Sequence, residues 1–186
     1  MLKISLRIGA IIALIISFVT LVPFAYSLAG EFDGAAFSGP SKALEIAGYL
    51  TMVLATALCF FAIREYREKR SQAAFTFLDG LKAGLATVFI ASVLFGVATA
   101  IGYAAVGPEK VDAFMRFYVE SGLPEGAGNE ERAAALAAYA EQKSLWLNPA
   151  FQGLIMALTV MLIGTVTATV SAFLLRNPAA RTRDTR

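Results

Sequence analysis

Apolar residues dominate four long stretches of this chain, and polar residues gather between them. Charged side chains are absent from residues 8–30, 46–63, 83–108 and 144–175, which together make up 99 of the 186 residues. A helix needs about 20 apolar residues to cross the hydrocarbon core of a bilayer. Each stretch is long enough for one crossing. The pattern therefore predicts an integral membrane protein and excludes the soluble enzymes.

Local signals indicate where the helices begin and end. Thr76 and Asp79 have the spacing of a capping box, so the third helix should begin near Phe77. Asn148 followed by Pro149 is typical of an N-cap and a first helical position. We expect an all-α fold, in which the whole chain forms one polytopic domain with four transmembrane helices in a bundle. The expected spans are about 5–28, 44–63, 81–106 and 149–175.

Residues 107–148 form the longest segment between the apolar stretches. Apolar residues recur there at the spacing of an amphipathic helix, namely Val111, Phe114, Met115 and Tyr118. A second helix should start at Asn129, because Glu130 and Glu131 then lie favourably in its first turn. Tyr139 and Trp146 suit the level of the lipid headgroups. The segment could act as a lid, as a partner-docking surface or as a connector lying on the membrane.

Charge differs between the two sides of the predicted bundle. The N-terminus, residues 64–82 and the tail from 176 hold 11 Lys and Arg against 4 Asp and Glu, whereas residues 30–45 and 107–148 hold 5 against 10. Because basic residues near helix ends stay in the cytoplasm, both termini and the tail 176–186 are predicted to be cytoplasmic, and 107–148 extracytoplasmic. The first stretch also resembles a signal peptide, but it is longer than a usual h-region of about 7–15 residues, which favours a retained anchor.

The composition offers few residues that could catalyse a reaction or bind a metal. The chain is 58% hydrophobic and 16% charged, has no histidine, and has one cysteine, Cys59. The chain therefore lacks the usual acid/base of neutral pH, which is also the commonest metal ligand, and it lacks histidine triads and cysteine clusters. A net charge of +2 gives no reason to expect nucleic acid binding. We predict no catalytic, cofactor-binding or metal-binding residues, and hence no enzyme.

The four charge-free stretches contain small and hydroxyl residues. Glu45 is the nearest ionisable group, one turn inside the second helix, where it could bind a cation, pair with Lys42 or act as an interfacial carboxylate. Gly84 and Gly96 in the third helix would let backbones approach closely, and hydroxyls would bond across helices. Helix packing, within the chain or between copies, explains this pattern better than a path for a solute.

Three segments carry a resemblance to a known family. They are EIAGYLTM at 45–52, IREYR at 63–67 and FTFLDGLKAGL at 75–85, and they resemble the bacterial membrane-protein family DUF4199. The resemblance implies four inner-membrane helices and no established activity, so it transfers no catalytic residues. It singles out six positions: Glu45, Gly48, Tyr49, Arg64, Arg67 and Lys82. The basic residues at 64–70 could contact anionic headgroups, although anchoring alone would require them.

The leading hypothesis is a non-enzymatic protein of the bacterial inner (plasma) membrane that acts by association. It would be an accessory subunit with a membrane-protein partner, or a self-assembling homo-oligomer, surrounded by the lipid bilayer. Leucine at Gly84 or Gly96 should then disrupt assembly more than folding. The alternatives are a small transporter or channel that uses Glu45, Tyr49, Tyr103 and the hydroxyl residues of the fourth helix along a path, and a lipid-handling envelope protein in which residues 107–148 hold lipid.

Overall fold

The computed structural model describes residues 1–27, 41–70, 75–124 and 126–176, with the side chains of 26–27 and 41–45 left out. This part of the chain is helical and without strands, as the sequence predicts. Its helices are α1 (Leu2–Ser27), α2 (Ser41–Ala57), α3 (Cys59–Lys69), α4 (Phe77–Val106), α5 (Pro108–Ser121), α6 (Asn129–Trp146) and α7 (Pro149–Leu175). Four segments are long and apolar enough to cross a membrane: α1, α2 with α3, α4, and α7.

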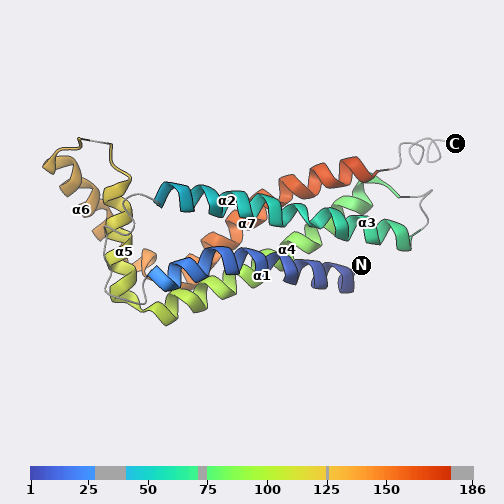
Figure 1. The fold of residues 1–186 in the computed structure, drawn as a ribbon, viewed down its shortest axis with the longest axis horizontal. Helices are drawn as coiled ribbons and strands as arrows, with labels where there is room; N and C mark the ends of the chain where they lie inside the picture. Colours follow the sequence, from blue (N-terminus) through green and yellow to red (C-terminus); the bar gives the residue numbers. More distant parts are fainter. Residues whose placement is uncertain (28–40, 71–74, 125, 177–186) are drawn as a thin grey trace.

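The four spanning segments lie lengthwise beside one another (Figure 1). Helices α5 and α6 lie across one end of this bundle, and the N-terminus and the end of α7 lie at the other. The structure thus gathers residues 64–70, the start of α4 and Arg176 at the end that holds the N-terminus. We call this the basic end, because its described residues at 1–9, 64–70, 75–82 and 176 include eight Lys and Arg against three Asp and Glu.

The second spanning segment differs from its predicted form in two ways. It was expected to stop at Ile63, but α3 continues through the charged residues to Lys69. The reason is that the end of an apolar run marks the edge of the hydrocarbon, whereas helical hydrogen bonds continue equally well in water. The segment is also interrupted at Leu58. Just before it, the Thr56 hydroxyl donates to the Met52 carbonyl at 2.7 Å, a bond of the kind that bends helices.

Helix α1 contributes a regular stripe to the core. Its buried isoleucines are four residues apart, at Ile4, Ile8, Ile12 and Ile16. This spacing keeps them on one helix face. They pack against Ala91 and Phe95 of α4 and Val160 of α7. The large residues on the other faces of α1, such as Leu14 and Phe18, are each 69% exposed, as expected of side chains that face lipid.

Helices α4 and α7 form the closest contact of the bundle. Gly96 faces Gly153, and a Cβ atom at Gly96 would lie 2.7 Å from the Gly153 carbonyl oxygen. Farther along, a Cβ atom at Gly84 would lie 2.9 Å from the Cβ of Ala168. Small residues therefore bring the two backbones together inside one chain. The prediction that leucine at these glycines would affect assembly more than folding is corrected, since both positions are filled by α7 of the same molecule.

The turn from α4 into α5 depends on a glycine. Gly107 ends α4 and precedes α5 with φ of +89°, a backbone conformation that other residues rarely adopt. Pro108 follows at the first position of α5, where no backbone N–H is needed. The capping box of Thr76 with Asp79 and the Asn148 cap before Pro149 are also present. Gly107 and Pro108 at one side and Asn148 at the other thus mark where the chain enters and leaves the α5–α6 segment at the end of the bundle.

Candidate functional site

Several hydroxyl groups of the bundle interior donate to carbonyls of their own helices, whereas Thr99 Oγ1 is buried without a partner among the described residues. Thr87 donates to the Ala83 carbonyl at 2.8 Å, and Ser92 donates to the Val88 carbonyl at 2.9 Å. The sequence predicts hydroxyl hydrogen bonds across helices. Among the described residues, the contacts that these hydroxyls make across helices are long and involve sulfur, as between Cys59 Sγ and Ser171 Oγ at 3.9 Å. This correction has a simple cause: a carbonyl four residues earlier is always within reach of a helical hydroxyl. The hydroxyls therefore line helix contacts.

The other predicted positions are scattered over the bundle. Tyr49 is 50% exposed on the outer surface of α2. A Cβ at Gly48 would make ordinary contact with Thr20 of α1, 3.9 Å away. Tyr103 stacks on Phe24 of α1, with ring centroids 4.8 Å apart, and belongs to the cluster beneath α5. The side chain of Glu45 lies outside the described residues, so its predicted roles are not tested here.

Ion pairs at the basic end connect three helices. Glu65 of α3 pairs with Arg7 of α1 and, at 2.8 Å, with Lys69 on its own helix. Arg70, next to α3, pairs with Asp79 of α4 at 2.6 Å. The Arg7–Glu65 and Arg70–Asp79 pairs therefore help to hold α1, α3 and α4 in place. Lys82 of α4 is exposed and makes no ion pair with any described residue.

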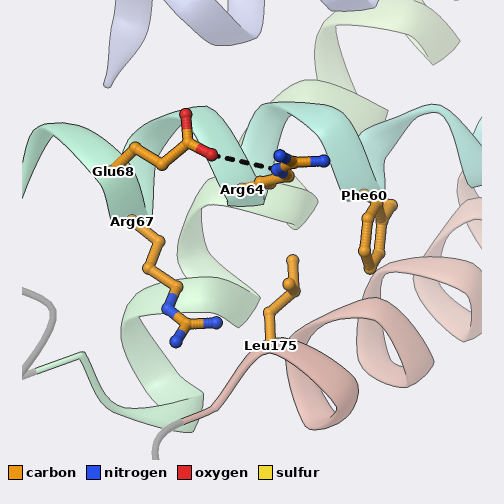
Figure 2. A pocket seen from close by; sticks show the side chains of 5 residues that line it. All are labelled: Phe60, Arg64, Arg67, Glu68 and Leu175. Atoms are coloured by element: carbon orange, nitrogen blue, oxygen red, sulfur yellow. Dashed lines mark hydrogen bonds and ion pairs between the residues drawn. The ribbon is translucent and has the colours of Figure 1, made fainter.

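Arg67 differs from its basic neighbours on α3. Its side chain is only partly exposed, and its Nε–H is buried without a hydrogen-bond acceptor in the described part of the chain. It lines a groove of about 360 Å³ between α3 and the end of α7, together with Phe60, Arg64, Glu68 and Leu175. Figure 2 shows the Arg67 side chain extending from α3 on the side of Leu175 of α7, in front of the light green ribbon of α4 in this view. In the same view Arg64 is paired with Glu68, at 2.9 Å.

A second groove adjoins the first at Phe60 and lies along the seam between α2–α3 and α7. Its volume is about 420 Å³, and Phe60 is shared by the two grooves. Its walls are mainly apolar and come from Ala57, Phe60, Phe61, Val166, Thr167, Val170, Ser171 and Leu174. A basic, polar groove thus adjoins an apolar one on the outside of the bundle. The sequence pointed to Arg64 and Arg67, but Phe60 and the α7 residues were missed because only the fold brings them beside the arginines.

At the opposite end, Asp112 joins α5 to α6. Its carboxylate accepts hydrogen bonds from the Tyr139 hydroxyl at 2.8 Å, from Lys143 Nζ at 2.8 Å and from Arg116 Nε at 3.3 Å. Burial alone would raise the pKa of Asp112, but the bonds from Lys143, Tyr139 and Arg116 lower it below its ordinary value. Burial, followed by the bond to Asp112, raises the pKa of Tyr139 to about 12. Tyr139 is buried and joins α6 to α5 through its hydrogen bond to Asp112.

Helix α6 is attached to the rest of the molecule along one side. Tyr139 is its one buried residue, and it packs with Val111 and Met115 of α5. The opposite side is exposed and consists largely of alanine, with acidic residues among them. We call this the α6 outer face and define it by Glu130, Ala133, Ala134, Ala137, Ala138, Glu141 and Leu145. Small side chains along one face permit the close approach of another helix.

No metal centre is found among the described residues, since they contain no group of three or more His, Cys, Asp or Glu side chains able to hold an ion. The arrangement therefore offers two distinctive surfaces, the paired grooves at the basic end and the α6 outer face.

Comparison with known proteins places the chain in a family. No curated protein and no solved structure matches it significantly. A family model described as "Protein of unknown function (DUF4199)" matches residues 7–177, a wider range than the motifs at 45–85 that carry the resemblance. The match agrees with the four apolar helices of the structure. The chain therefore belongs to the DUF4199 family of membrane proteins.

Proposed function

We propose that this multi-pass membrane protein is non-enzymatic and acts by association, with the α6 outer face as its docking surface. The observation that carries the proposal is that α6 is fixed on one side by Tyr139 and exposes alanine on the other. A helix at the surface of a protein usually buries its less polar face and exposes charge. Here four of the seven side chains that define the exposed face are alanine, and small side chains suit close contact with a further helix.

The neighbouring helix α5 makes this surface rigid. The Asp112 hydrogen bonds and the contacts of Val111, Met115 and Tyr139 hold α5 and α6 together. A rigid surface loses little conformational entropy when it binds a partner. The predicted topology would present α6 outside the cytoplasm, on the acidic side of the protein. The occupant would be a helix of a membrane-protein partner or of a second copy, which makes the chain an accessory subunit or a homo-oligomer.

Arginine substitution at the centre of the face tests the proposal. Ala137→Arg adds bulk and charge where the partner helix would approach, and arginine is a good helix former, so α6 itself should remain intact. Gln142→Arg is the matched control, because Gln142 is also exposed but lies about 140° around the helix from Ala137. Native mass spectrometry of gently purified protein should show about tenfold less of the partner or oligomer for Ala137→Arg, with little change for Gln142→Arg. Equal association in both variants and in the wild type would overturn the proposal.

A further inference from the structure

We propose that the paired grooves between α3 and α7 form a binding site for one anionic phospholipid, with the phosphate at Arg67 and an acyl chain in the apolar groove. This inference is independent of the association proposed above, since it concerns the opposite end of the molecule. It rests on three features of the described residues: the unpartnered guanidinium, the balance of charge in the groove and the apolar groove that adjoins it.

The first feature is the state of Arg67. Arg7, Arg64, Lys69 and Arg70 each pair with a carboxylate of the chain, but the Arg67 side chain has no ion pair with a described residue, and its buried Nε–H has no acceptor among them. A buried N–H without an acceptor is costly, so the group favours a ligand with acceptor oxygens. The guanidinium fork matches a phosphate, to which it can donate two parallel hydrogen bonds.

The second feature is the balance of charge in the groove. Glu68 is the one acidic residue of its lining, and its carboxylate already accepts from Arg64 Nε. That pair leaves Arg67 as the net charge of the groove. Lys and Arg exceed Asp and Glu by five over the described residues of the whole basic end. A lipid with net negative charge is therefore favoured over a zwitterionic lipid, whose cationic headgroup would be repelled.

The third feature is that the two grooves adjoin at Phe60. Phe60 borders both, so a molecule with its phosphate at Arg67 would place its hydrocarbon against Phe61, Val170 and Leu174. These residues lie on the outer surface of the bundle, where Phe61 is 53%, Val170 54% and Leu174 67% exposed. A free phosphate ion would use only the first groove. The combination of both grooves matches the two-part chemistry of a phospholipid of the adjacent leaflet.

Substitution of Arg67 tests the part of the proposed site that binds the lipid headgroup. Delipidated protein is titrated with phosphatidylglycerol or with phosphatidylcholine of the same chains, and native mass spectrometry counts the lipids retained. We expect one phosphatidylglycerol to bind at least about fivefold more tightly than phosphatidylcholine. Arg67→Gln should weaken phosphatidylglycerol binding about tenfold, whereas Lys82→Gln, which removes an exposed charge at the same end, should change it less than about twofold. Equal losses in the two variants would reduce the effect to general surface charge and overturn the proposal.

Substitution in the second groove tests the acyl-chain half and does not depend on Arg67. Val170→Trp fills the apolar groove, and Leu162→Trp is the control, since Leu162 is 71% exposed on α7 and does not line the groove. Circular dichroism and gel filtration check the fold of each variant. Val170→Trp should lose about tenfold in phosphatidylglycerol affinity and Leu162→Trp should not. Wild-type affinity in Val170→Trp would contradict the site, and so would inorganic phosphate binding as tightly as the lipid, because a free anion needs no apolar groove.

Discussion

Single glycines decide how closely the two central helices of this protein approach. At Gly96 and Gly84 of α4, the space that a side chain would occupy is taken by the backbone or the Cβ atoms of α7. Gly164 of α7 is equally constrained, because a Cβ atom there would overlap Val88 of α4. The same residue type has another role at Gly107, where the positive φ permits the turn into α5. The residue identity is thus explained by sterics at each of these positions.

The α4–α7 contact predicts a large difference between two glycine variants of α4. Gly96→Leu should separate the helices and destabilise the fold by about 3 kcal/mol or abolish folding, because the neighbouring Gly153 carbonyl belongs to backbone and cannot rotate away. Gly102→Leu is the control, since the nearest atom to a Cβ there is Leu21 Cδ2, at 4.0 Å. Thermal unfolding in detergent, followed by circular dichroism, measures the effect. Similar melting temperatures for the two variants would show that α4 and α7 do not meet at Gly96.

At the scale of elements, the pair of α5 and α6 depends on one partly buried carboxylate, that of Asp112. Asp112 is bonded by Tyr139, Lys143 and Arg116, so it holds two helices that share only a small apolar cluster. Glu65 has a comparable position at the basic end, where it connects α1 to α3. Both carboxylates join neighbouring helices through charge-assisted hydrogen bonds, which are stronger than those between neutral groups. The two ends of the bundle are therefore organised by polar contacts around an apolar middle.

The pKa values at Asp112 and Tyr139 predict a pH window for the α5–α6 contact. The pKa of Asp112 is lowered from its ordinary 3.8, so its contribution to stability is present above pH 3.8 and is lost as the pH falls through the lower folded value. The pKa of Tyr139 is raised from 10.0 to about 12, so its contribution is present below pH 10.0 and is lost as the pH rises through about 12. The single tryptophan, Trp146, lies in the same cluster and reports on it by fluorescence.

We expect the Trp146 emission to be constant between about pH 4 and 10 and to change beyond each limit. Asp112→Asn should remove the acid transition, and Tyr139→Phe should remove the alkaline one. Emission that responds to acid identically in wild type and Asp112→Asn would show that another group controls the contact.

At the scale of the whole molecule, charge is segregated between the two ends of the bundle. The end with α5 and α6 lies opposite the basic end (Figure 1). This separation is what the positive-inside rule requires of a protein whose N-terminus faces the cytoplasm. It also separates the two proposed activities, since the α6 outer face and the lipid grooves would lie on opposite sides of the membrane. Binding at one would leave the other accessible.

Cysteine labelling tests this orientation. Cys59 is buried, and its replacement by alanine provides a background for single exposed cysteines. Ala137→Cys on α6 should react with a maleimide that cannot cross the membrane. The cells used keep their plasma membrane intact, and only the layers outside it are made permeable to the reagent. Lys82→Cys, which is also exposed, should react only after the inner membrane is permeabilised. The reverse pattern would invert the topology and place the α6 outer face in the cytoplasm.

The sequence by itself determined the features that depend on local composition and spacing. Four apolar stretches predict four spanning helices because the hydrocarbon thickness requires about 20 apolar residues, whatever the neighbours. The Thr76 and Asn148 caps follow from groups only a few residues apart in the chain, and the structure contains both. The α5 and α6 helices follow likewise from helical periodicity and a favourable first turn.

The tertiary structure alone decided which residues meet across helices. The sequence cannot show whether Gly84 and Gly96 face their own chain or another copy, because small residues favour close packing in either case. It also cannot distinguish Arg67 from the paired arginines around it. Whether a guanidinium has an ion-pair partner depends on where the fold places the carboxylates of other turns and other helices. Asp112 with Tyr139, and Phe60 with Leu175, are brought together only by folding. These contacts join positions far apart in the chain, and their partners are set by the relative rotation and displacement of whole helices.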